Sequence, residues 1–185
     1  MDKILIHTCC APCSILVVEK FMKENYDIKL FFYNPNIHPY KEYLERLNSF
    51  VNFSKNLKID YMVGKYEYKD YFLNVSRNLN DRCLFCYQLR LNETARVAKE
   101  IEINNFTTTM LYSRYQKHEI IKKIGEYIAK DYLLNFIYFD LRESYYDGVK
   151  MAKDYNLYRQ KYCGCIFSEI ERFGGGRWLE SFQKY

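Results

Sequence analysis

The sequence predicts an α/β domain with a mostly parallel sheet and helices on both faces. Short β-branched or aromatic stretches alternate with helical stretches from one end of the chain to the other, the pattern of strand–helix–strand units. Apolar residues make up 49% of the 185 residues, enough for a sizeable core. With only 7 Gly and 3 Pro, long irregular loops should be few. We expect residues 1–185 to form this single domain, ending in a short aromatic and basic tail at about 174–185.

Five stretches have the composition of strands. The first is a short apolar run, and the fourth joins Phe106 to three β-branched threonines. The expected strands are 3–8, 28–33, 59–63, 106–111 and 135–139.

Helical spacing of apolar residues predicts the segments between the strands. In the first of them Ile15, Val18 and Phe21 recur every three residues, and Pro12 lies near the start, where its missing N–H costs nothing. The expected helices are 14–24, 40–57, 68–75, 86–101, 118–130, 144–155 and 166–173, with polar loops at 34–39 and 156–165. In such folds ligands bind at the carboxyl ends of the strands, and Cys9 follows the first strand directly.

The amino terminus carries no long apolar segment. The run from Ile4 to Ile6 is too short for a signal peptide, and no stretch reaches the roughly 18 apolar residues of a membrane span. We therefore expect a cytoplasmic protein with no membrane partner, a compartment in which structural disulfides are rare. The formal net charge of +5 permits a polyanionic partner without requiring one.

All seven cysteines fall into three clusters separated by roughly 70 to 80 residues. The clusters are C-C-x-x-C at Cys9, Cys10 and Cys13, C-x-x-C at Cys83 and Cys86, and C-G-C at Cys163 and Cys165. In a reducing compartment such clusters indicate metal or redox chemistry rather than a disulfide framework. Soft thiolates in excess favour an iron–sulfur cluster over zinc, which usually takes paired Cys or Cys/His knuckles.

Each cluster leaves alternatives open. Vicinal Cys9 and Cys10 suit separate irons of one cluster, or one of them binds a second metal. The C-G-C pair suits a strained, easily reduced disulfide, for which Gly164 supplies backbone freedom, or a cap on a second metal. Cys13 is either a further ligand or a packed thiol.

Five ordered sequence blocks resemble those of one family and together span nearly the whole chain. They are 7–14 (HTCCAPCS), 34–39 (NPNIHP) with Glu42, Tyr43 and Arg46, 82–87 (RCLFCY) with Arg90 and Leu91, 107–109 (TTT) with Leu111 and Ser113, and 158–165 (YRQKYCGC). In these blocks the chain resembles the epoxyqueuosine reductases of the QueH type.

The resemblance implies an oxidoreductase that removes the epoxide oxygen from epoxyqueuosine at the wobble position of tRNA, the last step of queuosine synthesis. It also implies a [4Fe-4S] cluster with a neighbouring iron, no cobalamin, and a Rossmann-like fold akin to the nucleotide-binding alpha hydrolases. The glycine-rich phosphate loop of those relatives is missing, so we expect no use of ATP. Carried over by position, the cluster ligands are Cys9, Cys10, Cys83 and Cys86, and the redox-active pair, or alternatively ligands of the second iron, are Cys163 and Cys165.

Epoxide deoxygenation also needs a proton donor and an electron donor, and no motif identifies the latter. The candidate proton donors are Asp81, His7, Tyr115 and His118, although a helix cap, a core histidine and surface positions explain them better. Basic and aromatic side chains could hold the tRNA anticodon arm by phosphate contacts and stacking. The candidates are Arg114, Lys117, Arg159, Lys161, Tyr162 and Arg177, with Lys122, Lys123, Tyr112 and Trp178 as further members.

Two other function classes remain compatible with the residues. A thiol–disulfide oxidoreductase would use only the C-x-x-C and C-G-C pairs and would be colourless. A zinc-stabilised RNA-binding module would contain zinc and transfer no electrons.

Overall fold

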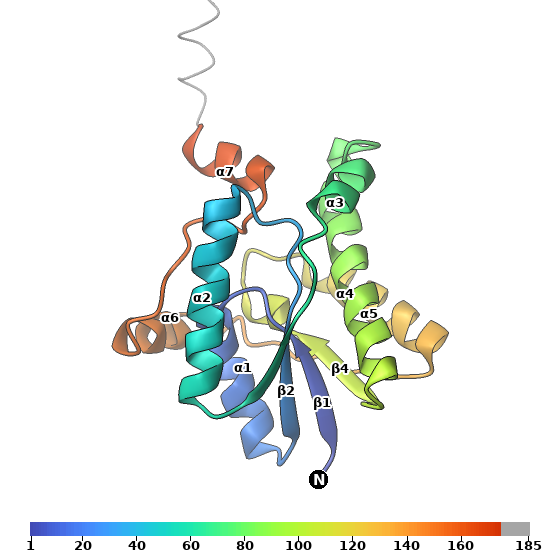
Figure 1. Cartoon of the computed structure of the whole chain (residues 1–185), viewed down its shortest axis with the longest axis vertical. Coiled ribbons are helices and arrows are strands. Elements are labelled where there is room, and N and C mark those ends of the chain that lie inside the picture. Colours follow the sequence, from blue (N-terminus) through green and yellow to red (C-terminus); the bar gives the residue numbers. More distant parts are fainter. Residues whose placement is uncertain (175–185) are drawn as a thin grey trace, which may run out of the picture.

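The chain folds around one parallel sheet, and this confirms the expected fold class. The structure is a computed structural model that describes residues 1–174. Within them the strand order is β3-β2-β1-β4-β5, and every neighbouring pair is parallel (Figure 1). The strands are β1 (Lys3–His7), β2 (Asp27–Phe32), β3 (Asp60–Val63), β4 (Asn105–Thr108) and β5 (Asn135–Phe136).

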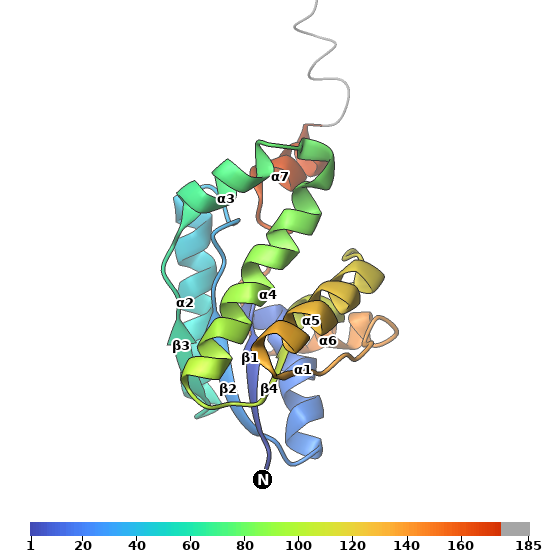
Figure 2. The ribbon, with the colours of Figure 1, turned by 90° about the vertical axis from the view of Figure 1, so that its right-hand side faces the viewer.

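Helices cover both faces of the sheet, as Figures 1 and 2 show. One layer contains α1 (Ala11–Lys23), α2 (Tyr40–Asn56) and α6 (Tyr145–Asp154). The other contains α3 (Tyr68–Val75), α4 (Arg82–Glu100) and α5 (His118–Tyr132). The last helix, α7 (Ile166–Phe173), lies beyond the carboxyl ends of the strands, at the top of Figure 1.

The core lies where the two central strands meet both helical layers. Leu5 on β1 and Phe106 on β4 are completely buried, as a strand covered on two faces requires. Polar residues are also buried at the carboxyl end of this pair, namely His7 and the threonines from Thr107 to Thr109. Since buried polar groups need partners, this end of the sheet is specialised for more than packing.

Four expected element boundaries differ from the structure by three residues or more, and one of them is the start of the first helix, at Ala11 instead of 14. The fourth strand ends at Thr108 instead of continuing to 111, because the Thr108 hydroxyl accepts the N–H of Met110 and starts a short 3₁₀ turn, η2 (Thr109–Tyr112). The fifth strand is only two residues long. Helix α4 begins at Arg82 instead of 86, directly after a second 3₁₀ turn, η1 (Leu79–Asp81), that the Asn78 side chain caps.

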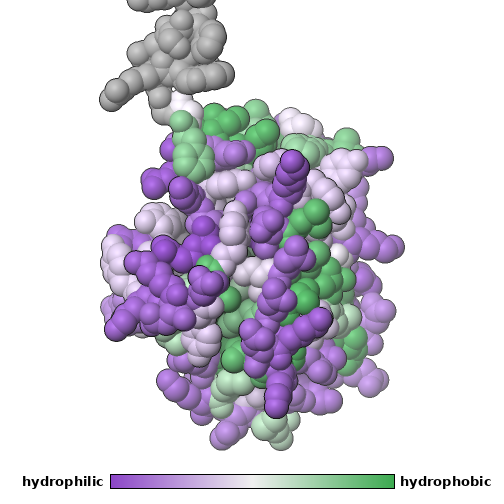
Figure 3. Space-filling model, turned by 60° about the vertical axis from the view of Figure 1, so that its left-hand side comes forward, coloured by the Kyte–Doolittle hydropathy of each residue, from purple (hydrophilic) through white to green (hydrophobic). Residues whose placement is uncertain are grey.

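The surface is mainly hydrophilic on the face that Figure 3 shows, and hydrophobic side chains gather near α7. Ile166, Ile170 and Phe173 of α7 are exposed. None of the described helices combines the length and the apolar character needed to cross a bilayer. The expected tail, with Arg177 and Trp178, lies outside the described residues from 175 onward.

Phe106→Ala should lower the free energy of unfolding of the metal-free protein by about 3–5 kcal/mol, because it leaves a cavity beneath Phe136, whose ring centre lies 5.2 Å away. The matched control is Tyr127→Ala on α5, where the side chain is exposed and the loss should stay within about 0.5 kcal/mol. Urea unfolding measures both, and equal losses in the two variants would contradict this description of the core.

Candidate functional site

The candidate site lies at the carboxyl ends of β1 and β4. These neighbouring strands connect to helices in opposite layers, so their ends form the topological switch point at which parallel α/β sheets ordinarily bind ligands. The chain leaves β1 through Thr8 and Cys9 and enters α1, with Cys10 as the residue before the helix and Pro12 in its first turn. The backbone N–H of Cys9 donates to Thr109 Oγ1 at 3.0 Å, which ties the first cysteine cluster to the end of β4.

Three thiols converge at this point. The Sγ atoms of Cys9, Cys10 and Cys13, here called the thiol triad, all lie within 4.8 Å of one another. Cys10 Sγ lies 3.8 Å from Cys9 Sγ and 2.8 Å from Cys13 Sγ, because residues three apart share one face of the first helical turn. The structure thus brings Cys13 into the same group as its two neighbours.

The triad is chemically suited to a soft metal. Around one tetrahedral ion with sulfur bonds of 2.3 Å, ligand sulfurs lie about 3.8 Å apart, which resembles the separation of Cys9 and Cys10. Ligands of a cubane bind different irons, so they must lie further apart than ligands of one ion. A cubane at this position therefore requires at least one of these side chains to turn outward and thiols from another element to join.

The three thiols of the triad differ in pKa. Hydrogen bonds from Cys10 and then Cys13, together with Arg90, hold the pKa of Cys9 well below its usual value. Burial raises the pKa of Cys10, and the hydrogen bond to Cys10 raises that of Cys13. One thiolate supported by two thiols is a set that can release further protons when a metal binds.

The second cysteine pair lies on the first turn of α4. Because this helix begins at Arg82, Cys83 and Cys86 lie about one turn apart at its amino-terminal end. Burial raises the pKa of Cys86 to about 11. The guanidinium of Arg90, one turn further along, lies 3.8 Å from Cys86 Sγ through Nη1. Its Nε donates toward His7 Nε2 at 3.3 Å and so links this pair to the end of β1.

The C-G-C loop is held by α2. Arg46 is 1% exposed, and its Nη1 donates to the carbonyl oxygen of Cys163 at 2.9 Å. The Gly164 carbonyl accepts the N–H of His38 at 2.8 Å. Gly164 has a φ of 126°, and a Cβ at this position would lie 2.9 Å from Ile37, so only glycine fits.

The two thiols of this loop face each other. Cys163 Sγ lies 3.7 Å from Cys165 Sγ, and the hydrogen bond between them lowers the pKa of Cys165 to about 5. The same bond raises the pKa of Cys163. Cys165 also lies in a small buried cluster with Tyr71, against which Cys86 packs. The second and third cysteine clusters therefore lie close together.

Gln160 links the loop of the third cysteine cluster to the first cluster. Gln160 Nε2, in the C-G-C loop region, donates to Cys10 Sγ at 2.7 Å. Each pair of clusters is thus connected: the first and second through Arg90, the second and third through the packing around Cys165, and the third and first through Gln160. In the part of the chain that the structure describes, only the triad has three ligand atoms within 4.8 Å.

The two candidate histidine proton donors are buried and engaged. His7 Nδ1 lies 2.9 Å from Thr108 Oγ1, and its Nε2 lies 3.0 Å from the Tyr33 carbonyl oxygen. Burial, and then the charge of Arg90, lower its pKa to about 3. His118 Nε2 lies 3.2 Å from the Ser113 carbonyl oxygen, and burial lowers the pKa of this imidazole.

The other two candidate proton donors are open to solvent. Asp81 is exposed directly before α4 and accepts a hydrogen bond from Asn78 Nδ2 at 2.7 Å. Tyr115 is 75% exposed, and its ring stands edge-on to Tyr145. These two side chains can meet a large substrate without a rearrangement of the core.

The expected RNA-contacting residues differ in exposure. Five are exposed cations: Arg114, Lys117, Lys123, Arg159 and Lys161. Tyr162 is half-buried, because its hydroxyl donates to the His38 carbonyl and its ring lies 5.3 Å from the Arg46 guanidinium carbon. Tyr112 is buried, and its hydroxyl donates to the Tyr145 carbonyl, so this ring does not reach the surface.

Arg114 is surrounded by aromatic rings. Its guanidinium carbon lies 5.6–5.9 Å from the ring centres of Tyr115, Tyr145 and Tyr146, and its Nη1 donates to the Tyr146 hydroxyl at 2.9 Å. Tyr115 and Tyr146 are both exposed. A cation set between exposed aromatic rings can contact a phosphate while the rings stack on bases.

Sequence reasoning assigned no role to Arg46, Arg90, Gln160 or Thr109. All four lie in the sequence blocks that resemble the family, and only for Arg90 does spacing add a further signal, since it lies four residues after Cys86 and hence on the same side of a helix. The others reach the cysteines across large sequence separations.

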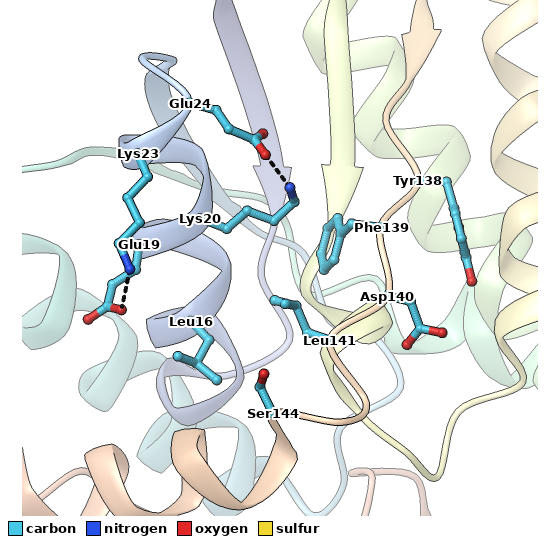
Figure 4. Close-up of a pocket in the computed structure, with 10 residues that line it drawn as sticks. All are labelled: Leu16, Glu19, Lys20, Lys23, Glu24, Tyr138, Phe139, Asp140, Leu141 and Ser144. Carbon is cyan, nitrogen blue, oxygen red and sulfur yellow. Dashed lines mark hydrogen bonds and ion pairs between the residues drawn. The ribbon is translucent and has the colours of Figure 1, made fainter.

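A cavity of about 570 Å³ lies apart from the thiols. It opens between the carboxyl-terminal half of α1 and the segment 138–144, as Figure 4 shows. The charged side chains on its rim pair with one another, Lys20 with Glu24 and Lys23 with Glu19. No cysteine is among its lining residues, so we place the candidate site at the thiols.

Lowering the pH should destabilise the metal-free protein through His7. Its folded pKa of about 3 lies below the ordinary 6.5, so the unfolded chain takes up the proton first and stability falls between pH 6.5 and about 3. The contribution of His7 reaches about 5 kcal/mol at most. In urea unfolding at several pH values His7→Gln should flatten this slope. An unchanged slope would show that folded His7 is charged.

Comparison with known proteins identifies the family. The family model described as epoxyqueuosine reductase QueH matches residues 4–171. An epoxyqueuosine reductase QueH from Dehalococcoides mccartyi is 36% identical, over 93% of this chain and 95% of its own length. Those of Staphylococcus aureus (34% identical, 92% of this chain, 77% of its own) and Thermotoga maritima (32% identical, 93% of each chain) are also similar.

Two solved structures share the fold at low sequence identity. The U34-tRNA thiolase NcsA from Methanococcus maripaludis, solved with its [4Fe-4S] cluster, has a TM-score of 0.60 and 16% identity over 90% of this chain and 61% of its own. A predicted subunit of tRNA methyltransferase from Methanocaldococcus jannaschii has a TM-score of 0.57 and 12% identity over 83% of this chain and 75% of its own. With the family model and the relatives, the conclusion is that this chain belongs to the epoxyqueuosine reductase QueH family and acts in epoxyqueuosine reduction during tRNA queuosine biosynthesis.

Proposed function

We propose that this chain removes the epoxide oxygen of epoxyqueuosine at the tRNA wobble position with a [4Fe-4S] cluster and an adjacent iron, and without cobalamin. The observation that carries the proposal is the convergence of cysteines from α1, α4 and the C-G-C loop at the carboxyl end of the sheet. Soft sulfur donors in this number exceed what one structural zinc needs, and they suit iron–sulfur chemistry.

The cluster ligands in this proposal are Cys9, Cys10, Cys83 and Cys86. The Arg90 bridge between Cys86 and the end of β1 supports a centre shared by α1 and α4. Cys163 and Cys165 are the redox-active pair or, in the alternative allocation, ligands of the second iron. Cys13 is the further thiol next to Cys10, close enough to join the ligands of the same metal.

The reaction consumes two electrons and two protons and releases the epoxide oxygen as water. The bound iron–sulfur centre would supply single electrons and a Lewis-acidic iron for the epoxide oxygen. Oxidation of the Cys163 thiol and the Cys165 thiolate to a disulfide would release the two electrons required and one proton, and the 3.7 Å separation of their sulfurs favours it. An external donor would then reduce the pair again.

The protein side chains would orient the substrate and deliver the remaining proton. Asp81 and Tyr115 are the proton-donor candidates that solvent and substrate reach, whereas His7 and His118 make hydrogen bonds inside the fold. The exposed cations Arg114, Lys117, Arg159 and Lys161 would contact the tRNA backbone, and Tyr115 would stack on an unpaired base. Tyr162 and Arg177 complete the proposed contacts.

Anaerobic purification tests the cofactor. We expect a brown protein with about four or five irons per chain. A colourless, metal-free protein would instead favour a thiol–disulfide oxidoreductase. One zinc per chain would favour a zinc-stabilised RNA-binding module. The three sulfurs of the triad lie close enough together to bind one zinc ion.

Single Cys→Ala variants test the ligand allocation. Loss of Cys9, Cys10, Cys83 or Cys86 should remove most of the iron and abolish turnover. Loss of Cys163 should leave the cluster iron bound while turnover fails. Iron analysis and an assay of epoxyqueuosine in tRNA measure both quantities. A Cys83→Ala protein with full iron and full turnover would contradict the assignment, and Cys13→Ala decides whether that thiol is a ligand.

The double variant R159A/K161A should weaken binding of the tRNA anticodon arm by about tenfold and lower the salt dependence of the affinity, because it removes two phosphate contacts. The matched control is Lys99→Ala, an exposed lysine at the far end of α4, which should leave affinity unchanged. Fluorescence anisotropy over a range of salt concentrations measures both variants. Equal affinities of wild type and double variant would exclude these contacts.

A further inference from the structure

Arg90 is a buried cation in the second helical layer. Its side chain lies on α4, one turn after Cys86, and the residue is 5% exposed. Arginine is seldom buried to this extent without a partner of opposite charge, because an unpaired charge loses its hydration on burial. Its surroundings should therefore contain an anion.

The described residues supply no carboxylate for this charge. Within hydrogen-bonding reach, the guanidinium meets Asn34 Oδ1 at 2.8 Å, His7 Nε2 at 3.3 Å and Cys86 Sγ at 3.8 Å. Among residues 1–174 no Asp or Glu lies within 4.0 Å of it. Asn34 and His7 satisfy two of its N–H groups but cannot neutralise it.

Two other arginines show what pairing ordinarily looks like in this chain. Arg46 is equally buried and has Glu42 Oε1 at 2.7 Å from its Nε. Arg96, on the same helix as Arg90 but exposed, has Glu93 and Glu100 at 2.8 Å. In the described part of the chain, only Arg90 is a buried arginine without a carboxylate partner. The sulfur of Cys86 is therefore the available source of negative charge.

The groups that face Arg90 from each packed element are consistent with sulfur as the source of negative charge. From β1 comes His7, whose Nε2 accepts the Arg90 Nε–H, so this nitrogen carries no proton of its own. From α4 comes Cys86, whose Sγ lies 3.8 Å from Arg90 Nη1, and Cys9 follows His7 by two residues in the loop after β1. The guanidinium therefore lies between the second cysteine cluster and the end of β1 that leads to the first, where its charge favours an anionic centre.

We propose that Arg90 is the charge-balancing residue of the metal centre: its guanidinium, fixed by Asn34 and His7, offsets the negative charge of a centre held by Cys86 and Cys9. The inference rests on the proposed function. Arg90 is a positioning residue, since it acts through the thiols. A fixed positive charge beside such a centre favours the state with one more electron, so Arg90 raises the reduction potential.

Arg90→Met tests the proposal, because methionine, like arginine, has a long unbranched side chain but carries no charge. We expect the variant to bind iron and to have a more negative midpoint potential than wild type in an anaerobic spectroelectrochemical titration. R90K, which restores a charge without the planar fork, should move the potential back toward that of wild type. The matched control is Arg96→Met on the exposed side of α4, which should leave the potential unchanged.

The outcomes separate the two proposals. An iron-loaded R90M with the wild-type potential would overturn the role of Arg90 while leaving the proposed function intact. A wild-type chain without iron would overturn both. If R90M folds, by circular dichroism, but holds no iron, retention of iron by R90K supports the charge role. Loss of iron by a folded R90K as well contradicts that role, because charge would then not be the property that matters.

Discussion

Because the strands of the sheet are parallel, every strand-to-helix connection leaves at the same edge, and the position of the thiols depends on this constraint. Cys9 and Cys10 occupy the connection after β1, and Thr109 in the connection after β4 holds the Cys9 backbone. Helix α4 runs back toward the opposite edge, so its first turn, with Cys83 and Cys86, also lies at this edge. The topology alone thus brings together residues more than 70 positions apart in sequence.

Around this edge the protein buries polar groups that a purely structural core would avoid. His7, Asn34, Arg46 and Arg90 are all nearly inaccessible, and each has hydrogen-bond partners across element boundaries. Such networks cost desolvation and are retained where they fix one geometry. Here they orient the C-G-C loop and the thiols of α4 relative to the end of β1. A site of this kind needs rigid support, since the proposed ligands come from three separate segments.

Much of the fold follows from local sequence patterns. The alternation of β-branched stretches with periodic helices predicts the sheet, and the short strand before Cys9 places the first cluster at its carboxyl end. The boundaries of α4 and β4 are harder to predict from sequence, because hydrogen bonds to the side chains of Asn78 and Thr108 set them. The contact of Gln160 with Cys10 joins positions 150 residues apart, and the Arg46 contact with Cys163 joins positions 117 apart. Tertiary packing sets such pairs, and no periodicity reveals them. The grouping of cysteines could be predicted, but not the residues that link the groups.

The dependence of the site on its last segment has a consequence for biosynthesis. During translation β1, α1 and α4 leave the ribosome well before the loop that carries Gln160 and Cys163, because synthesis runs from the amino terminus. Until that loop docks, the carbonyl acceptors that Tyr162 and Cys163 offer to Arg46 are missing, and Cys10 lacks the amide of Gln160. A nascent chain therefore displays an incomplete cysteine cluster to the cell. Delivery of metal to the proposed centre would therefore be best timed after release from the ribosome, when the docked loop adds Gln160 and the C-G-C thiols to the site.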